Sequence, residues 1–114
     1  MKVQVEKIVG VINKWANLHG AFGHATSGVA ERHCIMGGFE KELNGVVTPG
    51  NTISDKPILS HQITKEYGLS YPRQRELQGL NDKFPIEGTD ARRIALINKV
   101  KEWNTKGNGE VKQS

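Results

Sequence analysis

Sulfur and aromatic side chains are scarce in this chain. It contains a single cysteine, Cys34, so no disulfide can form within it. Only 6% of its residues are aromatic, and its 13 glycines follow no triplet repeat, which excludes a collagen-like chain. A lone cysteine is typical of a protein from a reducing compartment, so we expect a cytoplasmic location.

Long hydrophobic runs are also missing. The longest apolar stretch, residues 8–12, includes Gly10 and is far shorter than the roughly 18 residues of a membrane-spanning helix. Glu6 interrupts the apolar stretch that a signal peptide needs. We therefore expect a protein that neither spans a membrane nor carries an export signal.

The charge is moderately basic. Lys and Arg total 16 against 12 Asp and Glu, a net charge of +4, and most of the excess lies in residues 55–114. An excess of this size favours anionic partners without requiring them. A length of 114 residues suits one domain with one hydrophobic core.

Apolar residues recur every three to four positions at both ends of the chain, which predicts helices. The first is expected over residues 3–18. Gly10 in its middle costs about 1 kcal/mol relative to alanine, so we expect another backbone to pack closely there. The last is expected over residues 89–104, with Ile94, Ile97 and Val100 on its buried face. Trp15 and Trp103 are both expected in the core.

A second helix is expected to begin after Thr26 or Ser27, because these residues are good N-caps. The pair at 37–38, Gly-Gly, is expected to break or kink it. For residues 33–36 a short buried strand is the alternative, since periodicity cannot decide over four residues.

The middle of the chain is dense in turn formers. Residues 44–57 are expected to form a long, mobile loop whose Val46, Val47 and Ile53 either dock on the core or form a minor β-hairpin. Two helices follow, over residues 56–67, capped by Asp55, and over residues 71–82. The sequence thus predicts a single, mainly α-helical domain, 1–104, of four to five short helices and a disordered tail, 105–114.

A glycine turn separates two helical segments within residues 58–78. The letters ITKEYGLS and then PRQREL resemble the helix-turn-helix of bacterial DNA-binding proteins, including the promoter-reading module of sigma factors. The resemblance implies a positive φ at Gly68 and internal apolar contacts. The residues it assigns to those contacts are Ile63, Tyr67, Leu69 and Leu77.

Two positions depart from that family's pattern. Thr64 stands where the family usually has a small residue, and Gln74 stands where it usually has an aliphatic one. Both positions are normally buried in the family.

The resemblance implies a small regulatory protein that binds DNA or RNA through its helix-turn-helix-like segment, 56–82. Arginine can read guanine and glutamine can read adenine, while further cations meet phosphates. A homodimer would supply a second half-site. The residues expected at the nucleic acid are Ser70, Tyr71, Arg73, Gln74, Arg75, Lys65, Arg92 and Arg93.

Other functions stay open. The first helix and the glycine-rich segment could bind a protein partner, as an adaptor or inhibitor. The glycines at 23–28 could hold a phosphate or nucleotide on backbone amides. An enzyme could be built around His33, Cys34 or His61, but no catalytic or cofactor motif is present, and the histidines lack the paired spacing of zinc sites. We therefore expect no enzyme, no cofactor and no metal.

Overall fold

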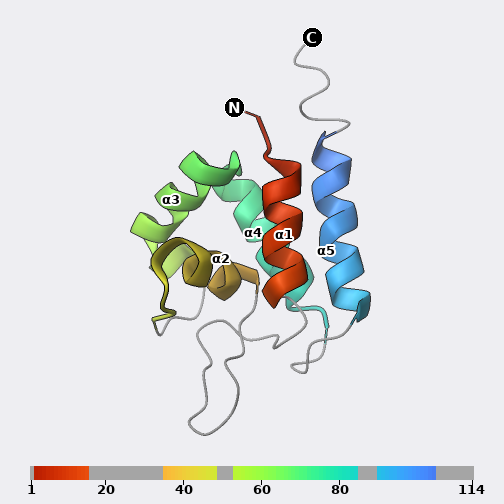
Figure 1. Ribbon diagram of the computed structural model, residues 1–114, viewed down its shortest axis with the longest axis horizontal. Coiled ribbons are helices and arrows are strands. Elements are labelled where there is room, and N and C mark those ends of the chain that lie inside the picture. The colour runs from red at the N-terminus through yellow and green to blue at the C-terminus, as the bar shows by residue number, and fades with distance from the viewer. Residues whose placement is uncertain (1, 16–34, 49–52, 85–89, 105–114) are drawn as a thin grey trace, which may run out of the picture.

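Helices make up the regular structure of the chain in a computed structural model, which describes residues 2–15, 35–48, 53–84 and 90–104 (Figure 1). Within these ranges there is no strand, so the prediction of a mainly α-helical domain is confirmed. The elements are α1 (Val5–Trp15), α2 (Ile35–Asn44), the 3₁₀ helix η1 (Ile53–Asp55), α3 (Pro57–Tyr67), α4 (Tyr71–Asn81) and α5 (Asp90–Trp103).

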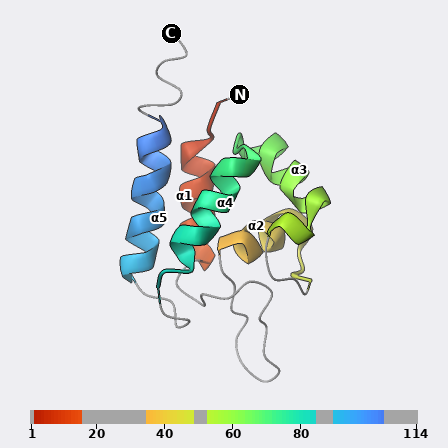
Figure 2. The same ribbon diagram turned by 180° about the vertical axis from the view of Figure 1, so that it is seen from behind.

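Two groups of helices pack together. Helices α1 and α5 lie side by side and run in opposite directions, while α2 and α3 lie to one side of them (Figure 1). Helix α4 packs against α5, α2, α3 and η1, and one of its faces is left uncovered when the molecule is seen from behind (Figure 2). This central position makes α4 both a core helix and a surface helix.

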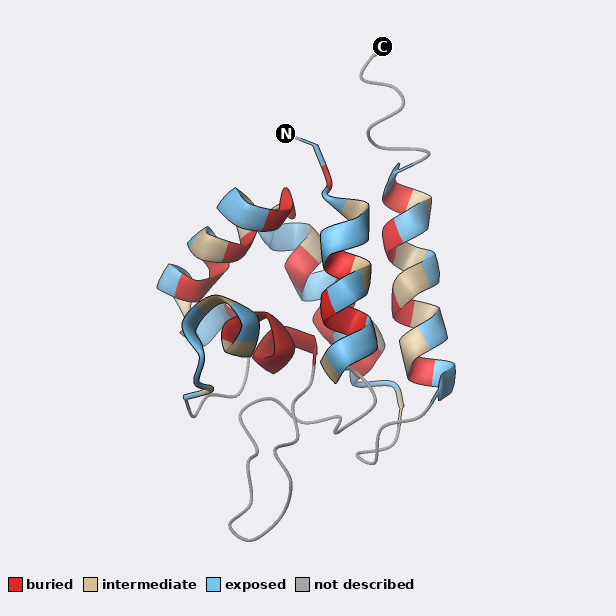
Figure 3. Ribbon diagram, viewed as in Figure 1, coloured by how far each residue is buried: buried red, intermediate tan, exposed pale blue. Residues whose placement is uncertain are grey.

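The core lies where the helices face each other, and the buried residues are on the stretches of ribbon that face a neighbouring helix (Figure 3). Full burial of an aliphatic or aromatic side chain contributes about 1.5–3 kcal/mol, so this cluster is the main source of stability. Its fully buried members are Ile8, Ile12, Ile35, Met36, Phe39, Ile53, Ile63, Leu69, Leu77, Leu96 and Val100. Trp103 belongs to it as expected, whereas Trp15 is half-buried and donates a hydrogen bond to Glu42.

The expected helix ends in the second half of the chain agree with α3, α4 and α5 to within one or two residues. One cap is wrong: Lys56 is the N-cap of α3, and Asp55 lies in η1. Three of the expected features lie outside the described residues. They are the start of a second helix near residue 26, the histidines near Cys34 with that cysteine, and the tail at 105–114. Ile35 and Met36 are helical, which excludes a strand for that half of residues 33–36.

The expected break at residues 37–38 is also wrong. Helix α2 runs through both glycines, which are buried. A Cβ on Gly38 would lie 2.8 Å from the Cβ of Trp15, whereas a Cβ on Gly10 would have nothing within 4 Å. The close approach expected at Gly10 is therefore found at Gly38, where the missing side chain lets α1 and α2 meet.

These two glycines form a matched pair for a stability measurement. Gly38→Ala is expected to lower the free energy of unfolding by about 1 kcal/mol, because α1 and α2 must separate to admit the methyl group. Gly10→Ala is expected to raise it by up to about 1 kcal/mol, since alanine favours an exposed helix. Urea unfolding of both variants checks this, and equal effects would contradict the packing role of Gly38.

The segment between α2 and α3 docks on the core through part of its length. Ile53 is fully buried and Val47 packs against the core, but Val46 is 53% exposed. Its residues 49–52 lie outside the described structure. Across the ranges that are described, no helix has the length and apolar character needed to cross a membrane.

Candidate nucleic-acid interface

The turn between α3 and α4 is built on Gly68. Gly68 has φ 71° and its N–H donates to the Thr64 carbonyl, so the predicted positive φ is confirmed. A Cβ on Gly68 would fall 2.7 Å from the carbonyl carbon of Lys2, and the N–H of Gln4 donates to the Tyr67 carbonyl at 2.9 Å. The N-terminal segment therefore packs directly on the outside of this turn.

Apolar contacts inside the turn are those expected from the sequence. Ile63, Leu69 and Leu77 are fully buried, and Tyr67 is 5% exposed. The Tyr67 ring packs against Phe39 of α2, with 4.8 Å between ring centroids. The two helices and the turn are thus anchored to α2 by a continuous apolar contact.

Gln74 is fully buried and does not reach the surface, which corrects its expected place near bases. Its side chain points into the angle between α3 and α4. The amide oxygen accepts a hydrogen bond from the Ser60 hydroxyl at 2.6 Å, and the amide nitrogen lies within hydrogen-bond distance of the carbonyls of Ser60 and Leu69. A buried amide is tolerated because these partners satisfy it.

The two departures from the helix-turn-helix pattern touch each other. The Gln74 amide nitrogen donates to the Thr64 hydroxyl at 2.9 Å, and that hydroxyl donates to the Leu69 carbonyl at 2.8 Å. A polar pair therefore fills the space that a small residue and an aliphatic residue usually fill.

The outer side of the first two turns of α4 carries Tyr71 and Arg75. Both are exposed, and the guanidinium of Arg75 lies over the Tyr71 ring, 5.8 Å from its centroid. The hydrogen bond from Arg75 lowers the pKa of the Tyr71 phenol, and a hydrogen bond with Ser54 acts in the same direction. Ser70, the N-cap of α4, makes no side-chain capping bond, so its hydroxyl does not cover the positive end of the helix.

Arg73 and Arg93 lie in different places. The guanidinium of Arg73 lies over the Trp103 ring, 5.1 Å from its centroid, at the far end of α5. Arg93 lies near the start of α5, where it donates to Asn13 of α1 at 2.9 Å and pairs with Asp90. Ten residues of helix separate Trp103 from Arg93, about 15 Å along the axis.

Arg92 is fully buried, which corrects its expected contact with phosphate. The buried face of α5 consists of Arg92, Leu96, Val100 and Trp103, while Ile94 is 48% exposed. Of the residues expected on the buried face, Val100 is fully buried and Ile97 packs against the core, so only Ile94 is wrong. The arginines of this half of the chain do not converge. Of the exposed cations near the turn, Arg75 and Lys65 lie on α4 and α3, while Lys2 and Lys7 come from the N-terminal segment and α1, where Lys7 pairs with Glu66.

A groove of about 450 Å³ runs between η1, α3 and the start of α4. No local signal in the sequence places Ser54 beside Tyr71, because that contact depends on how η1 docks. For His61 the sequence suggests only a catalytic role. The residues that line the groove are Ile53, Ser54, Pro57, Ser60, His61, Thr64 and Tyr71.

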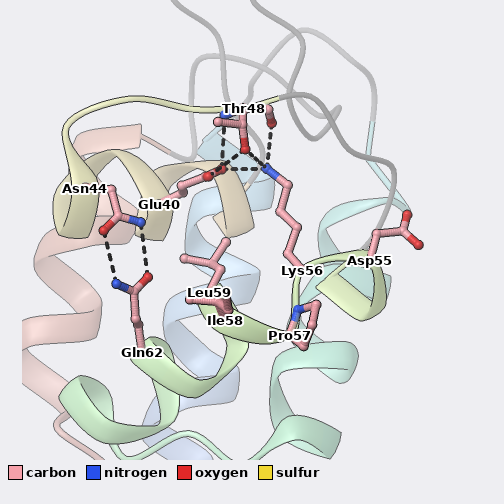
Figure 4. A pocket seen from close by; sticks show the side chains of 9 residues that line it. All are labelled: Glu40, Asn44, Thr48, Asp55, Lys56, Pro57, Ile58, Leu59 and Gln62. Carbon is pink, nitrogen blue, oxygen red and sulfur yellow. Dashed lines mark hydrogen bonds and ion pairs between the residues drawn. The ribbon is translucent and has the colours of Figure 1, made fainter.

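A second hollow, of about 430 Å³, lies between α2 and the start of α3 (Figure 4). Its wall holds a nearly buried ion pair, in which the Lys56 ammonium donates to Glu40 at 2.8 Å and to the Thr48 hydroxyl at 2.7 Å. Asn44 and Gln62 exchange two amide hydrogen bonds across it. These polar groups bind one another and tie α2, residue 48 and α3 together, which is a structural role.

Comparison with protein-family models, with curated proteins and with solved structures finds no match for this chain.

Proposed function

We propose that this protein binds nucleic acid through α3, α4 and the turn between them, as a small cytoplasmic regulator that acts as a homodimer. One observation carries the proposal: the first two turns of α4 present Tyr71 and Arg75 outward beside the glycine turn. An aromatic ring, a guanidinium and the positive end of a helix are groups that bind bases and phosphates.

The charge of this surface predicts weak binding for each copy. Two exposed cations, Arg75 and Lys65, are offered by α4 and α3, and Asp55 brings acidic charge close to Tyr71, while Glu76 pairs with Lys99 of α5. Two phosphate contacts give a salt dependence with a slope of about −1.8 on duplex DNA. Affinity is therefore expected to fall about tenfold between roughly 50 and 200 mM salt. A homodimer would raise it by presenting two such surfaces.

Arg75→Ala tests the proposal. We expect affinity for nucleic acid to fall about tenfold and the salt slope to decrease by about 1, because one phosphate contact is lost. The melting temperature should stay unchanged, since Arg75 is exposed. Fluorescence anisotropy with labelled oligonucleotides over a salt series measures both quantities.

Arg93→Ala is the matched control, because it removes the same charge on the α1 side of the molecule. It should leave affinity nearly unchanged. Equal losses in the two variants would show a general charge effect and would reject this surface, and no binding by the unaltered protein in low salt would reject the function.

A further inference from the structure

The groove beside Tyr71 has the size and lining of a site for a flat, partly apolar molecule. Its volume, about 450 Å³, lies within the roughly 300–1,000 Å³ of small-molecule sites. Pro57, which is exposed, supplies apolar surface over the buried Ile53, while the exposed imidazole of His61 supplies a polar group. A nucleobase has the same division, with apolar faces and a polar rim.

Tyr71 makes one wall of this groove and is held in place there. Its phenol is hydrogen-bonded to Ser54 of η1 and to Arg75, one turn further along α4. Its exposed ring, which lines the groove, can stack on a base that enters there. Stacking of this kind tolerates any base, because every base has an aromatic face.

The charges around Tyr71 indicate where a phosphate would lie. Arg75 lies over the ring, and the acidic Asp55 lies on the η1 side. A phosphate attached to a base in the groove is therefore favoured on the Arg75 side and disfavoured near Asp55. This places the sugar-phosphate backbone along the first turns of α4.

The same surface is poorly suited to reading a duplex. Gln74 is buried, Arg73 lies over Trp103, and Arg93 lies on the α1 side, so the side chains expected to read bases or hold phosphates are spread apart. A base inside a duplex cannot enter a groove without leaving its stack, which costs a few kcal/mol. An unpaired base enters at no such cost.

We infer that the groove lined by Tyr71, His61 and Pro57 binds an unpaired nucleobase, so that the nucleic acid is taken as a single strand with its phosphate on Arg75. This inference rests on the proposed function and specifies the form of its ligand.

The test compares an oligothymidylate, a hairpin duplex with the same number of phosphates, and a single strand of equal length without bases, all by anisotropy in low salt. The unaltered protein is expected to bind the oligothymidylate about tenfold more tightly than either other probe. Tyr71→Ala should remove most of this advantage, and Tyr71→Phe, which keeps the ring, should retain most of it. Thermal melting verifies that each variant is folded.

A double comparison isolates the stacking. Affinity is lost when the bases are removed from the probe and also when the Tyr71 ring is removed from the protein. These two losses should not add, because each change abolishes the same contact. If the duplex binds at least as tightly as the single strand, or if Tyr71→Ala weakens all three probes equally, the inference is overturned and the proposed function stands. If no probe binds, both are overturned.

Discussion

Gly68→Ala is expected to lower the free energy of unfolding by about 3 kcal/mol. Two costs contribute. The φ of 71° is unfavourable for a residue with a Cβ, and that Cβ would fall 2.7 Å from the carbonyl carbon of Lys2 and closer still to its oxygen. The N-terminal segment must move away, which exposes Val3, now 2% exposed, and breaks the hydrogen bond from Gln4 to Tyr67. Urea unfolding measures the loss.

The chain provides a matched control for this prediction. Gly45 has φ 79° but nothing within 4 Å of the position of a Cβ. Gly45→Ala should therefore lower the free energy of unfolding only through its unfavourable φ, by about 1–2 kcal/mol. A second check removes residues 1–3, after which Gly68→Ala should cost no more than Gly45→Ala. If the two substitutions cost the same in the full chain, the contact with Lys2 contributes nothing.

Gln74→Leu is expected to lower the free energy of unfolding by about 2 kcal/mol. Leucine matches the usual residue of a helix-turn-helix at this position, yet here it would leave the hydroxyl of Ser60 and the Ser60 carbonyl without their buried amide partner. Thr64 would lose its donor as well. Differential scanning calorimetry or urea unfolding measures the loss.

Thr64→Ala supplies the other half of a double-mutant cycle. Alone it should cost about 1 kcal/mol, because Gln74 loses one acceptor. Together the two substitutions should cost less than their sum by about 1 kcal/mol, since each removes the polar partner of the other. If the losses of unfolding free energy were strictly additive, the two residues would not be a coupled polar pair. As a control, Lys101→Ala, on the exposed side of α5, should change the free energy of unfolding little.

Helix positions in the second half of the chain could be predicted because their signals are local. Pro57 and Pro72 occupy first turns, and Gly68 ends α3 in the left-handed conformation. These residues act on their own neighbours in sequence, so no knowledge of distant packing is needed. The internal contact of Leu69 with the core followed from the same local pattern.

The buried polar residues could not be predicted in this way. Arg92 reads as a surface residue because its side chain is polar, and only the packing of α5 shows that it faces inward. Gln74 stands at a position that the helix-turn-helix pattern buries, but its polar side chain favours the surface, and only the structure shows the buried partners that satisfy it. In α5 apolar residues stand at positions 94 and 96, which lie on different sides of a helix, so the sequence alone fits either side as the buried face. The choice depends on where α1 and α4 lie, which is a property of the whole domain.

The candidate site was only partly accessible to sequence reasoning for a related reason. Tyr71 and Arg75 were identified because they start α4 beside the turn. Ser54 and His61 complete the groove from η1 and α3, and their approach to Tyr71 depends on the docking of the segment that follows α2. That docking is governed by Ile53, which is buried and whose N–H donates to Gln78 of α4.

The contact between Lys2 and Gly68 also has a consequence during synthesis. Residues 2–4 pack on a turn that is translated more than 60 residues later. At about 5–20 residues per second, this segment waits several seconds on the nascent polypeptide before its docking place exists.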